Sequence, residues 1–478
     1  MNIRISHTQY STEVISYLKV FYPLEKIEVN QNNQPLYEIT IGSSSIEVVY
    51  YGQDYNDDAS RHYDLEDQES YKHQYASFRP QKTVILKGLL YDLCSKITGI
   101  IPAWGVLIGI RPSKLAYKLY EDHGKKDAVD ILHQVYKVNP DKVKLLIKVV
   151  EVQKGFFTDT SILHSVYIGI PFCPTRCSYC SFTSHEIKSQ GRAYTEYVDA
   201  LIREMEARKD AFKQLRSIYI GGGTPTSLSE DDFDKLLRKI RALMGDQDVE
   251  FTVEAGRADT ITEKKLLSMR HYGVNRISIN PQTMQDETLA KIGRGHNAQT
   301  FIECVKMARR LGFKHINMDI ILGLPGEKVL DVEDTIRRVV ELEPESLTIH
   351  TMALKRGAKL IQEEKAYRTL MHDQIDGMLK ISQQIMDEAG YGPYYLYRQK
   401  NMIGNYENVG YCKEGYGCIY NIHTMEEKES IVAFGTGAIS KKVTGDRLVR
   451  KDHPKDVKMY LENIDEMITA NKFFWDNQ

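Results

Sequence analysis

The stretch YIGIPFCPTRCSYC, residues 167–180, follows a short apolar run that is typical of a buried strand. It places Cys173, Cys177 and Cys180 at the spacing Cys-x3-Cys-x2-Cys. Thiolates are the natural ligands of iron–sulfur clusters, and three thiolates on a four-iron cluster leave one iron without a protein ligand. Such an open iron can chelate the amino and carboxylate groups of S-adenosylmethionine (SAM). The stretch therefore predicts a 4Fe–4S cluster that binds SAM and cleaves it to an adenosyl radical.

A structural zinc site is the alternative for the same three cysteines. Zinc sites usually take four ligands in two pairs. No second pair follows at suitable spacing, although His185 is available as a fourth ligand. The flanking residues favour the cluster. The remaining cysteines are scattered, and we expect them to be core or surface residues: Cys94, Cys304, Cys412 and Cys418.

From the strand that precedes this loop onward, short β-branched runs alternate with amphipathic helical patterns. The expected strands are Val166–Ile170, Ser217–Ile220, Val249–Glu254, Arg276–Ile279, Ile316–Leu322 and Ser346–His350. The helices between them include Tyr194–Phe212, Glu230–Met244 and Gln299–Leu311, with Ser229 as an N-cap and Gly312 as a stop. Six such repeats predict an α/β fold with a parallel sheet and right-handed crossovers. Six units are too few for a complete eight-fold barrel, so we expect a partial (βα)6 barrel with one side open for a large substrate.

Polar residues follow or end several of these strands, where ligands of parallel sheets bind. The second strand ends in YIGGGTPTSL, and Gly221–Gly223 allow the backbone to approach a ligand such as the methionine end of SAM. A triple glycine alone is usually just a turn. Glu254 ends the third strand and can hold a ribose hydroxyl or an ammonium group, or else is a surface carboxylate.

The next two strands carry three further candidates. Gln282 follows the fourth strand, where its polar side chain is placed to recognise a ligand. Arg294 in KIGRGH is suited to bind a carboxylate. Asp319 lies inside an otherwise apolar strand, where a buried carboxylate needs a partner. The alternative for Arg294 and Asp319 is a structural salt bridge with each other.

The flanking regions carry no motif with a chemical meaning of its own. Residues 1–160 are expected to be an α+β region of unknown role, with a hairpin formed by Ile27–Asn30 and Leu36–Ile41 and with helices near Thr83–Ile97, Pro112–Asp122 and Lys126–Val150. Residues 161–360 are the expected barrel. Residues 361–478 begin with a long helix, Gln362–Glu388, and are expected to form a C-terminal extension that covers the substrate side.

Composition excludes several classes of protein. The chain has 478 residues, with 63 Lys and Arg against 65 Asp and Glu, so we expect no nucleic-acid partner. The longest apolar stretch, residues 100–110, is too short to span a bilayer, and the first residues lack the apolar core of a signal peptide. We therefore expect a cytoplasmic protein without a transmembrane segment. Tyr is plentiful, which suits a large planar ligand, although solvated Tyr-rich faces are commoner.

The motifs together resemble the oxygen-independent coproporphyrinogen III oxidase family of radical SAM enzymes, and the likeness runs from about Val166 to about Lys441. They are YIGIPFCPTRCSYC, GGGTPT, EAG, INPQT, IGRGH and DIILGLPG. The segments GVLIGIRPSKLAYKLY and YYLYRQKNMIGNYENVGY resemble the long HemZ-like branch of that family. The resemblance implies oxidative decarboxylation of two propionates of coproporphyrinogen III to vinyls, giving protoporphyrinogen IX. It also implies a tetrapyrrole substrate and a reducing partner such as flavodoxin or ferredoxin.

The same resemblance implies one or two SAM molecules near the cluster. The residues implied for the first are Tyr167, Gly222 and Glu254, and those implied for the second are Tyr179, Gly223, Thr224, Gln282, Arg294 and Asp319. Tyr167 and Arg294 are the candidate catalytic residues. These second-SAM residues occur across several branches of the family, so they do not identify the reaction.

Three positions depart from the family pattern. Gly169 stands where His is usual, Phe182 stands where a fourth Cys often lies, and Gly256-Arg257 replaces Asn-Pro. Phe182 is also typical of haem carriers and haem methyltransferases. Two alternatives therefore stay open: a haem-binding carrier that keeps its cluster, and an anaerobic haem-degrading or methyl-transferring radical enzyme. A carrier needs an axial haem ligand, for which His164, His185 and His423 are candidates, although a lone histidine is more often structural or exposed.

Overall fold

A computed structural model of the chain describes residues 1–23, 25–52, 59–64, 81–109, 111–157, 163–180, 184–353, 364–399, 406–445 and 447–476. Its contacts divide the chain into two compact units. One consists of residues 1–151 with 397–407, and the other of residues 152–396 with 408–478. None of the described helices has both the length and the apolar character needed to cross a bilayer.

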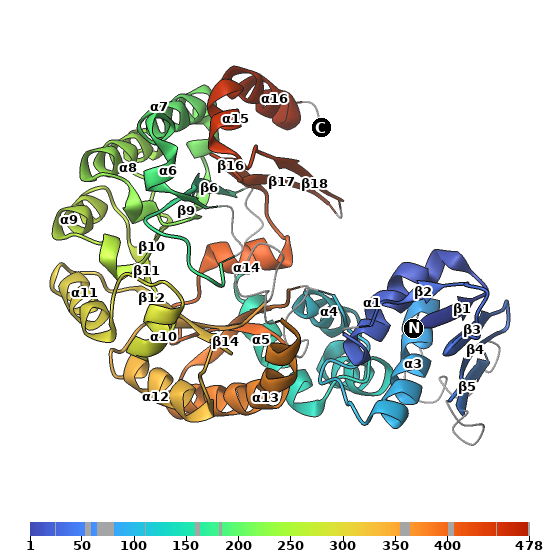
Figure 1. Cartoon of the computed structure of the whole chain (residues 1–478). Coiled ribbons are helices and arrows are strands. Elements are labelled where there is room, and N and C mark those ends of the chain that lie inside the picture. The colour runs from blue at the N-terminus through green and yellow to red at the C-terminus, as the bar shows by residue number, and fades with distance from the viewer. Residues whose placement is uncertain are drawn as a thin grey trace. The chain divides into compact units, whose positions relative to one another are not determined.

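The larger unit is built on the predicted parallel strands, which lie side by side in chain order (Figure 1). They are β6 (His164–Ile170), β9 (Leu215–Gly222), β10 (Glu250–Gly256), β11 (Arg276–Ile279), β12 (Ile316–Leu322) and β13 (Ser346–Thr351). Every neighbouring pair is parallel. The predicted α/β fold with a parallel sheet of six βα units is therefore confirmed.

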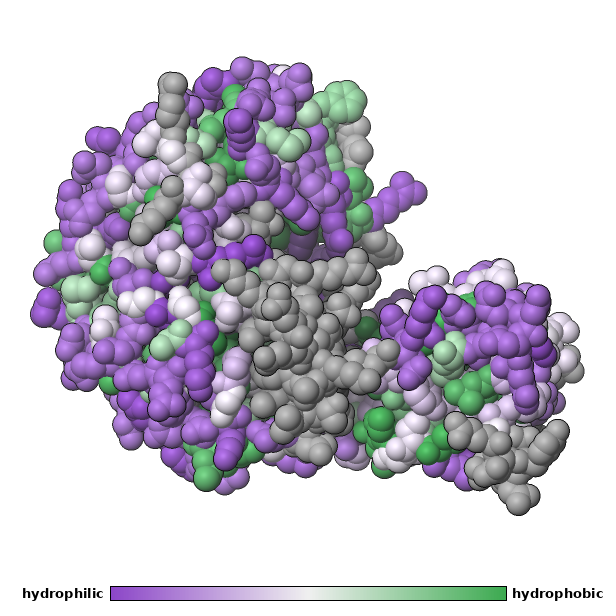
Figure 2. All heavy atoms as spheres, in the orientation of Figure 1, coloured by the Kyte–Doolittle hydropathy of each residue, from purple (hydrophilic) through white to green (hydrophobic). Residues whose placement is uncertain are grey.

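Helices cover the outer face of these strands (Figure 1). They include α7 (Arg192–Ala207), α8 (Glu230–Met244), α9 (Glu263–His271), α10 (Asp286–Lys291), α11 (Ala298–Arg310), α12 (Val329–Val340) and α13 (Glu364–Glu388). As predicted, the Ser229 hydroxyl caps α8 by accepting a hydrogen bond from the Asp232 amide at 3.1 Å. Gly312, at φ +88°, follows the end of α11 as predicted. Hydrophilic residues dominate the visible surface over these helices (Figure 2), as their amphipathic pattern requires.

The C-terminal residues extend this sheet at both edges. Strands β14 (Gly392–Tyr397) and β15 (Asn408–Cys412) lie beyond β13, and β15 pairs with β13 in antiparallel orientation. Strands β16 (Ile431–Phe434), β17 (Ile439–Thr444) and β18 (Arg447–Asp452) lie beyond β6, and β16 pairs with β6 in parallel. Helices α14 (Ile419–Glu426), α15 (Val457–Glu462) and α16 (Ile464–Asp476) complete the unit. The observed division thus differs from the expected three regions, because these strands share the sheet of the barrel.

A buried carboxylate on α7 anchors the end of the chain. Glu204 is 1% exposed. Its oxygens accept hydrogen bonds from the Gly435 amide at 3.0 Å, the Tyr460 hydroxyl at 2.7 Å and the Asn471 amide at 3.1 Å, and lie 2.8 Å from His453 Nε2. Because each partner comes from the C-terminal residues, this network fixes them against the barrel.

The smaller unit contains a sheet in the order β2-β1-β3-β4-β5. Its strands are β1 (Asn2–Ile5), β2 (Glu28–Val29), β3 (Tyr37–Ile41), β4 (Ser45–Tyr50) and β5 (Ala59–Asp64). The predicted hairpin of residues 27–41 is wrong, since β2 and β3 both pair in parallel with β1, which lies between them. The antiparallel hairpin is instead formed by β3 and β4.

The helices of this unit are α1 (Ser11–Phe21), α3 (Lys82–Thr98), α4 (Pro112–Asp130) and α5 (Pro140–Lys154). The single helix predicted over residues 126–150 is wrong. The helical pattern continues into a π-helical turn, Ile131–Val135, and then stops at Lys137, whose φ is +57°. Helix α5 restarts at Pro140, because proline fits the first turn of a helix and not its interior.

Candidate functional site

The three cysteines lie on one loop at the carboxyl end of β6. Cys173 ends the short strand β7 (Phe172–Cys173), which pairs with β8 (His185–Glu186), and is 9% exposed. Cys177 and Cys180 are half-buried, and the Cys180 amide donates to the Cys177 carbonyl oxygen at 3.1 Å. Burial raises the pKa of the Cys173 thiol. No three His, Cys, Asp or Glu side chains in the described ranges are grouped closely enough to hold a single metal ion.

The loop that precedes Gly295, in the motif KIGRGH, supports the cysteine loop. The Ser178 amide donates to the Ile292 carbonyl oxygen at 3.1 Å, and the Thr175 hydroxyl donates to the Gly293 carbonyl oxygen at 3.3 Å. Two motifs that lie more than 100 residues apart in the sequence are therefore in direct contact.

The glycine turn after β9 lies beside the cysteine loop. The Gly223 amide donates to the Ile170 carbonyl oxygen and the Thr224 amide to the Phe172 carbonyl oxygen, both at 2.7 Å. A Cβ on Gly223 would lie 2.5 Å from that Phe172 oxygen, and one on Gly222, at φ +113°, would lie 2.8 Å from the Ile170 oxygen. Close packing of two backbones thus requires glycine at both positions, whatever ligand the turn also admits. The Thr224 hydroxyl lies 3.4 Å from the Cys173 sulfur.

Glu254 lies at a bulge of β10 and contacts a stack of tyrosines. Its Oε1 accepts a hydrogen bond from the Tyr219 hydroxyl at 2.6 Å. The Tyr219 ring is nearly parallel to the rings of Tyr167 and Tyr420, with centroids 6.3 and 4.4 Å away. Burial raises the pKa of Glu254 to about 7, and nearby Asp319 acts in the same direction. A carboxyl with such a pKa gains or loses a proton near neutral pH.

Asp319, on β12, is held by the side-chain amides of two asparagines. Its two oxygens accept hydrogen bonds from Asn280 Nδ2 at 2.9 Å and Asn317 Nδ2 at 2.8 Å, and His350 Nε2 lies 3.6 Å away. Burial acts to raise the pKa of Asp319, but His350 and the hydrogen bonds of Asn317 and Thr348 hold it below its usual value. The carboxylate is therefore kept ionised.

Gln282 and Arg294 present buried polar atoms that lack a partner. Gln282 has φ +67°, its backbone pairs with β12, and its side chain is nearly buried with Oε1 unbonded. The Nε of Arg294 is likewise buried without a hydrogen bond. Among the ion pairs of the described residues, none joins Arg294 to Asp319. Unsatisfied buried groups are costly, so these atoms suit a bound polar ligand.

Tyr179 lies near Arg294 and two of the cysteines, Cys177 and Cys180. Burial raises the pKa of its hydroxyl, the guanidinium of Arg294 lowers it, and the sulfur of Cys177 is a hydrogen-bond partner. The three thiols, with the orphaned Nε of Arg294 close to Tyr179, thus form a donor set that fits an iron–sulfur cluster with a charged cofactor beside it.

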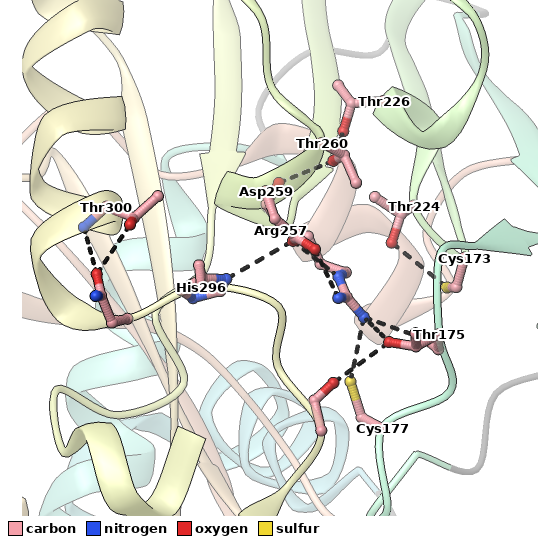
Figure 3. A network of polar contacts seen from close by, with 12 residues as sticks. Cys173, Thr175, Cys177, Thr224, Thr226, Arg257, Asp259, Thr260, His296 and Thr300 are labelled. Carbon is pink, nitrogen blue, oxygen red and sulfur yellow. Dashed lines mark hydrogen bonds and ion pairs between the residues drawn. The ribbon is translucent and has the colours of Figure 1, made fainter. Parts of the chain in front are cut away.

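A buried arginine also reaches the cysteine loop (Figure 3). It is one of the residues that depart from the family pattern, and it was not among the predicted site residues. Arg257 follows β10 and is 3% exposed. Its Nη1 lies 2.9 Å from the Thr175 hydroxyl and 3.9 Å from the Cys177 sulfur, while Nε and Nη2 donate to Asp259. The signal that could have found it is the motif EAGR itself, which puts a cation at the carboxyl end of a barrel strand.

The structure gives a packing reason for Gly169. A Cβ at this position would lie 3.2 Å from the Thr436 carbonyl oxygen, because the residues after β16 run beside β6. The Tyr197 hydroxyl donates to the Gly169 carbonyl oxygen at 2.7 Å and accepts from the Thr436 amide at 2.9 Å. Little space is left for the histidine that is usual there. Phe182 lies outside the described residues.

Of the three candidate haem-ligating histidines, His185 lies beside the cysteine loop, on β8 opposite Phe172, and the other two do not. His164 is at the amino end of β6, the opposite end from the cysteines, and its Nε2 lies 2.7 Å from the Ala211 carbonyl oxygen. His185 Nε2 lies 3.2 Å from the Lys455 carbonyl oxygen. His423 is buried on α14, and burial lowers its pKa to about 4.

Comparison with known proteins agrees with this geometry. A family model for the radical SAM superfamily matches residues 167–339. The oxygen-independent coproporphyrinogen-III oxidase-like protein HemZ of Bacillus subtilis is 39% identical over 78% of this chain and 77% of its own length. The heme chaperone HemW of Bacillus subtilis is 33% identical over 64% of this chain and 76% of its own. The structure of coproporphyrinogen III oxidase (HemN) from Escherichia coli superposes with a TM-score of 0.53 at 23% identity, covering 66% of this chain and 72% of that one, and so shares the fold.

The partial barrel with its cysteine loop defines the class of protein. Membership of this class implies a 4Fe–4S cluster and SAM as cofactors. The chain belongs to the radical SAM superfamily and, within it, to the oxygen-independent coproporphyrinogen III oxidase-like family. The predicted resemblance is thereby confirmed.

Proposed function

We propose that this protein is a radical SAM oxidoreductase that converts coproporphyrinogen III to protoporphyrinogen IX by oxidative decarboxylation of two propionates. The observation that carries the proposal is that three thiols lie on one loop at the carboxyl end of β6, where Tyr179 lies near the guanidinium of Arg294, whose Nε is buried without a hydrogen bond. The name of the 39% identical relative, an oxidase-like protein, points to the same substrate class.

In this proposal Cys173, Cys177 and Cys180 hold the 4Fe–4S cluster. When bound, the cluster and SAM supply one-electron cleavage of a carbon–sulfur bond and hence hydrogen abstraction from the substrate. The chain's part is to place these groups. Its loop backbone brings the three sulfurs onto one turn, and the amide of Cys180 stabilises that turn.

The polar side chains at the carboxyl ends of the strands would bind and orient SAM. Glu254, with Tyr167 beside it, would hold the ribose or amino group of the first molecule. Asp319 is kept ionised and suits the ammonium of a second molecule, whose carboxylate would meet Arg294. Tyr179, Gly223, Thr224 and Gln282 would complete that second site, with Tyr167 and Arg294 as the catalytic candidates.

A haem-binding chaperone is the second candidate, because the heme chaperone HemW of Bacillus subtilis is 33% identical to this chain. The two functions share the cluster and differ in the fate of the tetrapyrrole. His164 lies at the end of β6 away from the cysteines, whereas His185 lies on β8 beside the strand that carries Cys173. The higher identity to the oxidase-like relative, 39% against 33% for the chaperone, favours the decarboxylase.

The test begins with the anaerobically reconstituted protein, SAM, a reductant such as flavodoxin, and coproporphyrinogen III, with products identified by mass spectrometry. We expect loss of two carboxyl groups per substrate molecule. Cys177→Ala should lose iron and SAM cleavage but keep its fold, because the barrel core does not depend on the loop, and Cys304→Ala serves as the control in a buried cysteine elsewhere. Full iron loading in Cys177→Ala would overturn the cluster assignment. Tight stoichiometric haem binding with an intense Soret band and no turnover would favour the chaperone.

A further inference from the structure

The last residue of the motif EAGR is Arg257, whose guanidinium lies beside the cysteine loop. Strand β10 has a register shift between Glu254 and Gly256, and Gly256 has φ +63°, so the chain turns sharply before Arg257. The Arg257 side chain then runs inward and is 3% exposed. Figure 3 shows it between Asp259 on one side and Thr175 and Cys177 on the other.

The guanidinium of Arg257 uses its two ends for different partners. Nε and Nη2 donate to the two oxygens of Asp259 at 3.0 and 2.8 Å, which is a bidentate pair. Nη1 donates to the Thr175 hydroxyl at 2.9 Å and to the Thr175 carbonyl oxygen at 3.1 Å. The same nitrogen lies 3.9 Å from the Cys177 sulfur. The bidentate pair with Asp259 therefore restricts rotation of the guanidinium and keeps its Nη1 close to the Cys177 sulfur.

Packing holds the Arg257–Asp259 pair in this position. A Cβ on Gly295 would lie 2.3 Å from Asp259 Oδ2 and 3.1 Å from Arg257 Nη2, so the backbone of the IGRGH motif rests directly on the pair. The His296 ring is buried, with Nδ1 3.7 Å from Asp259 Oδ1. Burial acts to raise the pKa of Asp259, but His296 and Arg257 hold it well below its usual range.

We propose that Arg257 is a positioning residue for Cys177 and that its charge raises the reduction potential of the cluster. The inference rests on the proposed cluster at the three cysteines. A cluster held by thiolates gains negative charge when it is reduced, so a fixed cation beside a ligand sulfur stabilises the reduced form. Because water is largely excluded around Arg257, its field is screened less than that of a surface arginine. The carboxylate of Asp259 partly offsets that field.

The alternative is a purely structural role, in which Arg257 only holds the loop in place through its hydrogen bonds to Thr175. The two roles predict different results when the charge of the pair is changed in opposite directions. Arg257→Gln removes the positive charge, whereas Asp259→Asn removes the negative one and keeps the arginine. Arg257→Lys keeps the charge but loses the bidentate fork. The matched control is Arg309→Gln, because Arg309 pairs with Glu345 at the amino end of β12, away from the cysteine loop.

The experiment is an anaerobic redox titration of the reconstituted full chain, followed by the electron paramagnetic resonance signal of the reduced cluster, with iron content measured on the same samples. We expect the midpoint potential to shift negative in Arg257→Gln and positive in Asp259→Asn. Arg257→Lys should stay near the parent value with a lower iron content, since the loop is held less well. Arg309→Gln should keep both the potential and the iron.

Shifts of the same sign in Arg257→Gln and Asp259→Asn would overturn the electrostatic role, as would unchanged potentials in both. If Arg257→Gln retains too little iron to titrate, Asp259→Asn alone decides, and a potential that is unchanged or more negative refutes the proposal. Failure of the cluster assignment is distinguishable, because it appears as full iron content in Cys177→Ala and not as a potential.

Discussion

The raised pKa of Glu254 makes a quantitative prediction about the stability of the cluster-free protein. The change is Glu254→Gln, which keeps the size of the side chain and its ability to accept the Tyr219 hydrogen bond. The carboxyl has a pKa of about 7 in the folded chain, against an ordinary value of 4.5, with burial as the main cause. Folding therefore disfavours ionisation of this group.

The sign follows from proton binding. Below the ordinary value of 4.5 both states carry the proton, and above pH 7 neither does, so stability changes only between these limits. Within that window the folded state binds more protons, and the wild-type protein loses stability as the pH rises. From about pH 5.5 to about pH 8 the loss amounts to roughly 2 kcal/mol, because 1.5 of the 2.5 pKa units lie in this range.

The glutamine variant lacks this term, so its free energy of unfolding relative to wild type should rise by about 2 kcal/mol over the same pH range. Urea unfolding of the larger unit at both pH values, followed by tyrosine fluorescence, measures the difference. Glu287→Gln, at an exposed position of α10, is the matched control. Parallel pH profiles for wild type and Glu254→Gln would refute the reasoning, since they would mean that Glu254 titrates alike in the folded and unfolded chain.

Three further predictions concern the site and its frame. Arg294→Ala should keep its iron and its first SAM but lose turnover, because lost charge-assisted hydrogen bonds cost about 1.5–3 kcal/mol each; a lowered melting temperature with activity kept in the cold would show a structural role instead. Gly223→Ala should lower stability by about 1–3 kcal/mol and reduce iron loading, since the new methyl group overlaps the Phe172 oxygen, and equal iron contents would contradict this. Ser229→Ala should cost about 1 kcal/mol in urea unfolding, because the Asp232 amide loses its cap, and no change would show that the cap contributes nothing.

The sequence predicted the barrel well because its signals are local. Short β-branched runs, the cap at Ser229 and the stop at Gly312 each depend on a few neighbouring residues, and β11 and β12 have the predicted limits. The break of the helix predicted over residues 126–150 is also local, at Lys137 and Pro140, whereas the failure of the predicted hairpin depends on a distant partner. Nothing within residues 27–41 reveals that β1 inserts between β2 and β3.

The candidate site shows the same division. The cysteine spacing and the strand-end positions of Glu254 and Asp319 are readable from motifs. The glycine turn was predicted to make room for a ligand, whereas its contacts show that backbone packing against Ile170 and Phe172 already requires glycine. The contact between Arg257 and Cys177 joins residues 80 positions apart, so spacing within one motif could not predict it.

The pairing of β15 with β13 and of β16 with β6 has a consequence for how the chain is made. Both edge strands of the parallel sheet stay unpaired until residues 408–434 have been synthesised. Unpaired edges are templates for association with other chains, so a nascent chain that stops before residue 408 exposes two of them at once. Premature termination before residue 408 should therefore yield aggregates and not a smaller working protein.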